Sequence, residues 1–264
     1  MKELLKQIER RILPVSADRW LRAKLRGREY VPSVGTACFG DLRQMKPISP
    51  NWGYDRGIPV SCYYVEKFLS AHADDIRGRV MEIEDDRYTR KFGGVRAIQA
   101  DVLHVTGANP YATIIGDLTR AEDFPADTFD CVVLTQTLQF IYDLKAAIAT
   151  LYKILKPGGV VLATFPGTTQ SHYSSVKSSN YWTHDTENRS DRWCWSFTTL
   201  SASKLFAEAF DTGNIQVQSY GNVLSAIAAL QGMAVEELRP AELDYHDPDY
   251  QVLIAVRAEK SVNS

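Results

Sequence analysis

Residues 117–166 constrain the fold more than any other segment, because they predict a strand, a helix, a turn and a second strand in succession. Val132-Val133-Leu134 is apolar and β-branched, which is typical of a strand buried on both faces of a parallel sheet. Apolar residues then recur every three or four positions from 138 to 155, the spacing of an amphipathic helix. Lys156-Pro157-Gly158-Gly159 predicts a sharp turn, and residues 160–165 predict the next strand. In open sheets built this way, ligands lie beyond the carboxyl ends of the strands.

The composition favours one α/β domain with a modest extension. The chain has 264 residues, of which 45% are hydrophobic and 23% charged. Its four cysteines, Cys38, Cys62, Cys131 and Cys194, show no CxxC spacing, so we expect reduced thiols in a cytoplasmic protein. The sequence contains no signal-peptide pattern and no apolar run of membrane-spanning length. A net charge of −2 argues against a general nucleic-acid binder.

The first thirty residues form a basic arm, with nine Lys or Arg against four acidic residues. Apolar residues at helical spacing predict two short amphipathic helices separated at Pro14. The arm is either docked on the domain with its charges solvated, or it contacts a membrane surface or a partner.

Seven strands emerge when the other segments are added. Strands are expected at residues 79–83, 95–101, 112–116, 215–220 and 250–256, and helices at 62–73, 201–210 and 223–233. The fold class is therefore α/β, a doubly wound and mostly parallel seven-stranded sheet with an N-terminal helical extension. We expect a helical arm and loop over residues 1–53, the main domain over 54–258 and a tail over 259–264.

The order of these motifs resembles class I S-adenosylmethionine (AdoMet) dependent methyltransferases over residues 54–258. Residues 88–94, 134–139 and 220–223 are similar to segments of a bacterial group often linked to glycan or natural-product biosynthesis. The resemblance implies a Rossmann-like fold, AdoMet as the cofactor and a small-molecule acceptor.

The resemblance also implies a set of cofactor contacts. Glu82 matches the acidic residue of the first strand, near the methionine end of AdoMet. Asp101 matches the acid at the end of the second strand, which accepts hydrogen bonds from the ribose hydroxyls. Asp117 matches the acceptor for the adenine amino group. The other residues implied at the cofactor are Ile83, Val102, Leu118, Thr135, Gln136 and Thr137. Without a cofactor, Asp117 would be a surface turn and Asp101 a solvated strand end.

The turn after the first strand departs from the family pattern. Glu84-Asp85-Asp86 stands where these enzymes place glycines, and an inward Glu84 would crowd AdoMet and repel its carboxylate. Arg56 could compensate by pairing with that carboxylate, and Tyr54 or Tyr63 by donating a hydroxyl. The alternative for Arg56 is a surface ion pair with Asp55 or another acid.

The segment at 167–200 is the variable region in which acceptor-binding residues of this class often lie. It is rich in aromatic and polar residues, which suits a small-molecule pocket. We expect His184 as the catalytic base, His172 as the second choice, and Asp185 or Asp191 as orienting groups. The segment could instead be a surface lid whose histidines have no catalytic role. A further alternative is that a His/Asp cluster in this segment holds a divalent ion, although no ligand spacing supports a metal site.

These observations predict methylation of oxygen, with nitrogen as the less favoured acceptor atom, on a small molecule such as a sugar or a secondary metabolite. The alternative is a methyltransferase-fold protein with a degenerate cofactor turn, which acts as a non-methylating partner or catalyses another reaction. A nucleic-acid substrate is disfavoured, because the Asn/Asp-Pro-Pro-Tyr/Phe signature is absent after the fourth strand. A homodimer is compatible with the sequence.

Overall fold

The computed structural model describes residues 15–28, 30–171 and 193–262. The chain divides into two units, residues 1–45 and 46–264. The described part of the first unit contains helix α2, Val15–Leu25, and the short 3₁₀ helix η1, Gly40–Leu42. Helix α2 confirms the second of the two predicted helices of the arm, whereas the helix expected before Pro14 lies outside the described residues.

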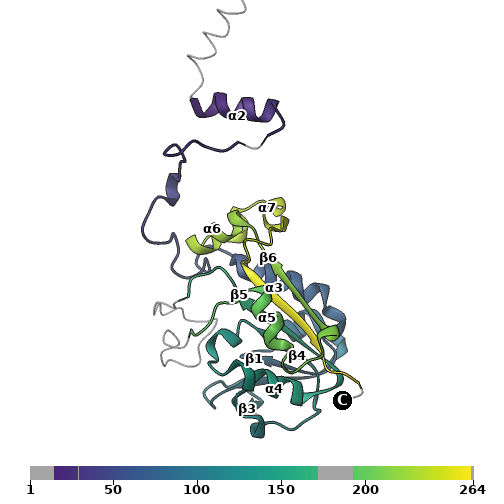
Figure 1. Cartoon of the computed structure of the whole chain (residues 1–264). Helices are drawn as coiled ribbons and strands as arrows, with labels where there is room; N and C mark the ends of the chain where they lie inside the picture. The colour runs from purple at the N-terminus through teal and green to yellow at the C-terminus, as the bar shows by residue number, and fades with distance from the viewer. Residues whose placement is uncertain (1–14, 29, 172–192, 263–264) are drawn as a thin grey trace, which may run out of the picture. The chain divides into compact units, whose positions relative to one another are not determined.

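The second unit is built on one seven-stranded sheet with the order β3-β2-β1-β4-β5-β7-β6 (Figure 1). Its strands are β1 Gly78–Ile83, β2 Ala97–His104, β3 Ile114–Ile115, β4 Phe129–Thr135, β5 Leu155–Pro166, β6 Ile215–Tyr220 and β7 Leu253–Glu259. Its α-helices are α3 Val60–Ala71, α4 Leu144–Ile154, α5 Thr199–Phe206, α6 Val223–Gln231 and α7 Pro240–Asp244. Strands β1 to β5 are parallel to one another, whereas β7 is antiparallel to both β5 and β6. This topology confirms the predicted doubly wound sheet.

Two hydrophobic layers cover the sheet, one on each face. On one face, Ile148 of α4 and Phe206 of α5 pack with Val132 of β4 in one cluster of buried side chains. On the other face, Phe68 of α3 packs with Val133 of β4 in a second cluster, which includes residues of α6. Because β4 contributes alternate residues to both clusters, it is buried on both faces, as its apolar run predicts.

Helix α4 and the turn after it differ from the prediction. Residues 138–140 form a separate 3₁₀ turn, η6, and Asp143 then caps α4 by accepting the N–H of Ala146 at 3.0 Å. The predicted turn at 156–159 is instead a bulge within β5, whose pairing with β4 shifts between Phe129 and Cys131. Gly159 is needed there, since a Cβ would lie 2.9 Å from two backbone oxygens.

The β1–β3 half of the sheet has short helices in place of long ones. A five-residue π-helix, η3 Thr89–Gly93, and a 3₁₀ turn, η4 Gly94–Arg96, follow β1. Residues 105–113, between β2 and β3, contain no helix. The other 3₁₀ turns are η2 Ala73–Asp75, η5 Ala121–Asp123, η8 Thr212–Asn214 and η9 Val235–Glu237. The face of β2 is therefore open to a pocket.

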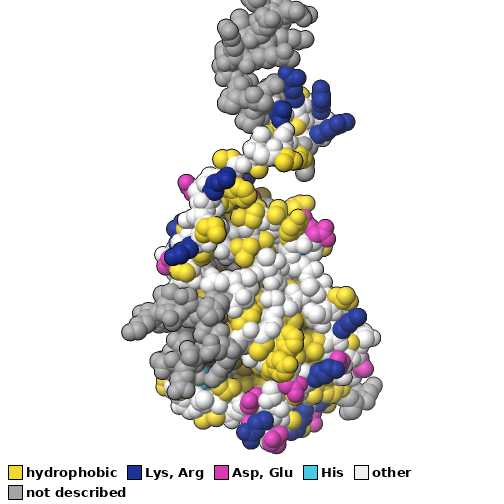
Figure 2. Space-filling view, turned by 60° about the vertical axis from the view of Figure 1, so that its left-hand side comes forward, with side chains coloured by type: hydrophobic (Ala, Val, Ile, Leu, Met, Phe, Trp, Pro, Cys, Tyr) yellow, Lys and Arg dark blue, Asp and Glu magenta, His cyan; other side chains and the backbone are white. Residues whose placement is uncertain are grey.

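On the face shown in Figure 2, residues 46–264 have no extended patch of charged side chains of one sign. There, basic and acidic side chains of residues 46–264 are interspersed, and hydrophobic side chains gather in patches. Cys131 is buried in β4 as a free thiol, in agreement with its predicted place in a core strand. Within the described residues, no helix is long and apolar enough to cross a bilayer.

Candidate functional site

The candidate site lies at the edge of the sheet where β1, β2 and β4 end. These strands are parallel and adjacent, in register over Glu82, Val102 and Val133, so their carboxyl ends meet at one edge. The last residues of these strands and the turns that follow them include most of the residues for which a cofactor contact is expected. Ligands of doubly wound sheets bind at such an edge.

Glu82 holds the turn after β1 rather than facing solvent. Its side chain is 2% exposed and accepts the N–H of Tyr88 at 3.1 Å and that of Thr89 at 2.7 Å. Burial raises the pKa of Glu82 to about 7, against the opposing effect of the N–H groups of Thr89 and Tyr88. The carboxyl group thus caps η3, in a turn that contains no glycine.

Glu84 is the central residue of a γ-turn with positive φ. Asp85 donates its N–H to the carbonyl of Ile83 at 2.9 Å, and φ of Glu84 is 74°. The backbone therefore follows a path that favours glycine, with a glutamate in its place. The Glu84 side chain turns toward β2, where its Oε1 lies 3.7 Å from Nε2 of His104. The predicted crowding requires an inward carboxylate, whereas this one is directed at the neighbouring strand.

Asp101 does not end the second strand, and this expectation was wrong. It lies opposite Met81 in the middle of β2, is 5% exposed, and accepts bonds from Arg79 at 2.7 Å and Thr113 at 3.2 Å. Strand β2 continues to His104, because Val102 and Leu103 extend its buried run. Asp101 thus makes cross-strand contacts inside the sheet. Its assignment to the ribose was based on a position at the strand end, which it does not occupy, and remains a prediction.

His104 is the residue that the sequence interpretation missed. It is 3% exposed, ends β2, and its Nδ1 lies 2.8 Å from the carbonyl oxygen and 3.1 Å from the nitrogen of Thr106. Its Nε2 is buried without a hydrogen-bond partner. A histidine directly after the apolar pair Val102-Leu103 was the available signal.

Asp117 and Leu118 form the turn after β3. Asp117 is partly buried, and its Oδ1 accepts both the N–H and the hydroxyl of Thr119 at 2.9 Å. Leu118 is 3% exposed and belongs to the hydrophobic cluster that includes Met81. The turn thus places the Asp117 carboxylate next to a buried apolar side chain, and the assignment of both residues to the adenine ring remains a prediction.

The carboxyl end of β4 carries polar atoms without partners. Gln136 has φ of 47°, and its side-chain Nε2 is buried without a hydrogen bond, as is Oε1 of Gln139. Thr137 donates its hydroxyl to the carbonyl of Thr135 at 3.0 Å. Left-handed non-glycine residues and unsatisfied buried amides are both uncommon, and they concentrate at functional sites.

Aromatic rings adjoin this strand end. Trp193 packs edge-on against Phe140 with ring centroids 5.4 Å apart, and Trp195 stacks on Tyr142 at 5.7 Å. The indole N–H of Trp193 is buried without a partner. The structure thus brings the end of the variable segment to the residues that follow β4.

Arg56, Tyr54 and Tyr63 have protein partners. Arg56 forms a bidentate ion pair with Glu237, one bond of which is 3.0 Å. Tyr63 donates its hydroxyl to Asp244 at 2.8 Å, which raises the pKa of Tyr63 to about 12. The hydroxyl of Tyr54 lies 3.4 Å from Sγ of Cys62. A contact between Arg56 and a cofactor carboxylate would require the pair with Glu237 to open, so these three assignments remain predictions.

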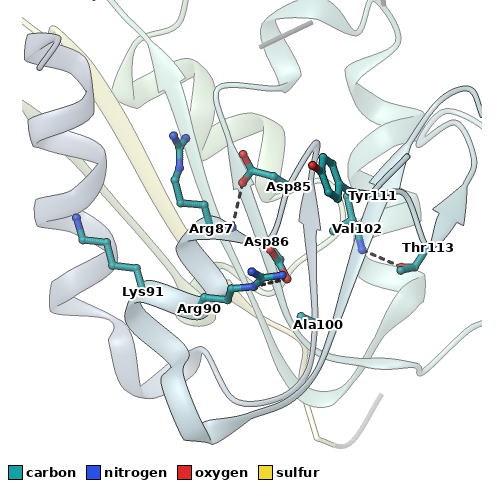
Figure 3. Close-up of a pocket in the computed structure, with 9 residues that line it drawn as sticks. All are labelled: Asp85, Asp86, Arg87, Arg90, Lys91, Ala100, Val102, Tyr111 and Thr113. Carbon is teal, nitrogen blue, oxygen red and sulfur yellow. Dashed lines mark hydrogen bonds and ion pairs between the residues drawn. The ribbon is translucent and has the colours of Figure 1, made fainter. Parts of the chain in front are cut away.

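A pocket of about 740 Å³ opens on the face of β2 (Figure 3). It is lined by Asp85, Asp86, Arg87, Arg90, Lys91, Ala100, Val102, Tyr111 and Thr113. Figure 3 shows Arg90 turned toward Asp86, to which its Nε donates at 2.7 Å. Val102 is the residue that the pocket shares with the predicted cofactor set.

The four predicted catalytic residues, His184, His172, Asp185 and Asp191, lie outside the described residues. Among the described residues, no group of three or more His, Cys, Asp or Glu is arranged to hold a metal ion.

The described residues fit an AdoMet-like ligand at this edge. Polar atoms of Gln136 and Gln139 are buried without partners, the β1 turn follows a glycine-like path, and Asp117 stands beside an apolar wall. A nucleoside bearing an amino acid chain offers donors and acceptors to each of these groups.

Comparison with known proteins agrees with this geometry. Residues 68–163, from the end of α3 into β5, match the methyltransferase domain family. Together with the strand order, the match supports a class I methyltransferase domain with AdoMet as its cofactor. The ubiquinone/menaquinone biosynthesis C-methyltransferase of Marinomonas sp. (strain MWYL1) is 46% identical over 43 residues, which are 16% of this chain and 17% of that protein.

Solved structures show similar but distant arrangements. A SAM-dependent methyltransferase from Archaeoglobus fulgidus has a TM-score of 0.47 at 11% identity, covering 75% of this chain and 94% of that one. An S-adenosylmethionine-dependent methyltransferase from Mesorhizobium loti has a TM-score of 0.46 at 16% identity, covering 76% of this chain and 98% of that one.

Proposed function

We propose that this protein transfers the methyl group of AdoMet to an oxygen atom of a small molecule, such as a sugar or a secondary metabolite, in the cytoplasm. The observation that carries the proposal is the carboxyl end of β4, where buried amide atoms of Gln136 and Gln139 lack partners. These residues follow a strand of the segment that matches a methyltransferase domain. AdoMet supplies an electrophilic methyl group on a sulfonium.

An aromatic wall with a few polar atoms supports a small organic acceptor. Trp193 packs edge-on against Phe140 and Trp195 stacks on Tyr142, and the indole N–H of Trp193, buried without a partner, could donate to an acceptor oxygen. Methyl transfer is an in-line displacement, so the main task of the protein is to orient the acceptor. Gln136 and Gln139 can do so by hydrogen bonding, while the rings exclude water.

An alcohol acceptor must also lose its proton, and we assign this step to His184, with His172 as the second candidate and Asp185 or Asp191 as orienting groups. Substitution of His184 by Asn should lower kcat and remove the rise in rate on the acidic side of the pH–rate profile, because that limb reports deprotonation of the base. His246→Asn is a matched control, because the ring of His246 is hydrogen-bonded to the hydroxyl of Ser219 at 3.0 Å and is not assigned to the reaction. A His184→Asn enzyme with an unchanged pH profile would refute this assignment.

Titration calorimetry with AdoMet and S-adenosylhomocysteine tests the cofactor, and transfer from AdoMet with a labelled methyl group to a panel of sugars and metabolites tests the acceptor. The curated relative is named a C-methyltransferase, so the labelled product is analysed by NMR to distinguish O-methyl from C-methyl groups. Absence of cofactor binding would refute the proposal. Binding without transfer to any acceptor would favour the alternative, a non-methylating protein on the same fold.

A further inference from the structure

We infer that helix α2 and the basic residues beside it bind the surface of an anionic lipid membrane. The inference goes beyond the proposed function and does not depend on it, since it concerns the arm rather than the cofactor site. Of the contacts that the sequence leaves open for the arm, it selects a membrane surface over a protein surface.

The first observation is the charge of the arm. Between residues 15 and 28 the chain has five Lys or Arg and one acidic residue, whereas the whole chain has a net charge of −2. The positive charge is therefore local, and Figure 2 shows basic side chains gathered on this part of the arm. Each Lys or Arg adds to the attraction of a segment to anionic lipids, so the arm is complementary in charge to such a surface.

The second observation is the separation of cationic and apolar side chains along α2. Leu21 and Leu25 lie four residues apart and therefore share one face of the helix. Arg19, Arg22 and Arg26 lie three and four residues apart on another face, and Arg26 still donates its N–H to the carbonyl of Arg22 at 3.2 Å. A helix with leucines on one face and cations on another can lie in the plane of a membrane interface.

The third observation is that α2 gains little packing within its own unit. Leu21 is 43% exposed and Leu25 is 78% exposed, so the described residues of the arm do not bury this face. A helix of 11 residues is only marginally stable in water without such packing. The leucines therefore need an apolar surface, which the boundary of the acyl chains provides and a polar polyanion such as a nucleic acid does not.

Trp20 and Lys24 fit the boundary between lipid headgroups and acyl chains. Trp20 is 48% exposed, and Nζ of Lys24 lies 4.8 Å from the centre of its ring. Tryptophan is enriched at this depth, and the long stem of a lysine lets its charge reach the headgroups. A protein partner would have to bury Lys24 together with the ring, and lysine is depleted in the cores of protein interfaces. This pair therefore favours a membrane.

The test is co-sedimentation of the full chain with vesicles of phosphatidylcholine and with vesicles of an equimolar mixture of phosphatidylcholine and phosphatidylglycerol. The protein should bind the mixed vesicles only, and added salt should weaken the binding. Lys24→Glu with Arg26→Glu should lower partitioning about tenfold or more, and so should Leu21→Ser with Leu25→Ser. The mixed vesicles should also protect the arm from trypsin, which cleaves after its basic residues.

Matched controls come from residues 46–264. Arg120→Glu with Lys145→Glu makes the same change in net charge, at side chains that are 61% and 73% exposed. Leu230→Ser replaces a leucine that is 44% exposed, close to the value for Leu21. These controls should leave partitioning unchanged.

Three results would overturn the inference. The first is no binding to the mixed vesicles, which would favour a protein surface as the contact of α2. The second is binding that the charge reversals weaken and the leucine substitutions do not, which would show a general attraction to polyanions. The third is an equal loss of partitioning for the arm variants and their controls.

Discussion

The buried carboxyl group of Glu82 should make the stability of this protein fall as the pH rises toward neutrality. Burial raises its pKa from 4.5 to about 7. Between these values the native state keeps a proton that the unfolded chain has already released, so the free energy of unfolding decreases with pH in this window. A shift of this size, at 1.36 kcal/mol per unit, corresponds to about 3 kcal/mol.

The perturbation is Glu82→Gln, which keeps an oxygen that can accept one of the two N–H groups and cannot ionise. The free energy of unfolding is measured by urea denaturation at several pH values from 5 to 8, for this variant and for the unmodified protein. Relative to the variant, the unmodified protein should lose about 3 kcal/mol over this range, or about 1 M in the urea midpoint. Glu122→Gln, at an exposed carboxylate, is the control and should follow the unmodified protein.

A difference between Glu82→Gln and the unmodified protein that stays constant from pH 5 to 8 would refute the raised pKa. A difference that grows in favour of the unmodified protein would show that the N–H groups of Tyr88 and Thr89 outweigh burial.

Three further predictions concern stability, each measured by urea denaturation. Burial alone would raise the pKa of Asp75, but His72 and Arg257 hold this pKa well below its usual range. Asp75→Asn should therefore lower the free energy of unfolding by about 1–3 kcal/mol at pH 7, and by progressively less as the pH falls below 4. A loss of stability that does not change with pH would contradict this. Gly159→Ala should lower the free energy of unfolding by about 1–3 kcal/mol, because the new Cβ would lie 2.9 Å from two backbone oxygens in the bulge of β5. Gly213→Ala, where a Cβ would meet no atom within 4 Å, should lower it much less. Equal losses for the two variants would show that the bulge does not require glycine. Asn222→Ala should cost about 2 kcal/mol, since the side chain caps α6 and donates to the carbonyls of Glu242 and Tyr245 at 2.7 Å; a cost near zero would contradict this.

Local sequence pattern was enough to predict the buried strands and the layers around them. Apolar residues are spaced as a strand requires in β1, β4 and β5 and as a helix requires in α4. This spacing determines which side chains of each element are buried. The segment at 220–223, which resembles a family motif, has a structural explanation, because Asn222 is the cap of α6.

The details of the site depend on contacts between segments distant in the sequence. Arg56 pairs with Glu237, 181 residues away, and no local pattern indicates that partner. The end of β2 depends on register with β1, which places Asp101 opposite Met81 rather than at the edge. The sequence of the turn after β1 is typical of a polar surface turn. Its conformation depends on the Glu82 carboxylate, which accepts the backbone N–H groups of Tyr88 and Thr89 at the start of η3.

The position of β7 in the sheet sets the order in which the chain can fold during synthesis. Strand β7 lies between β5 and β6, and β6 pairs with β7 rather than with β5. Until residues 253–259 have left the ribosome, β5 lacks its outer neighbour and β6 has nothing in the sheet to pair with. Nascent chains that stall before residue 253 should therefore expose unpaired strand edges and depend on chaperones, although every strand of the cofactor half has already been made.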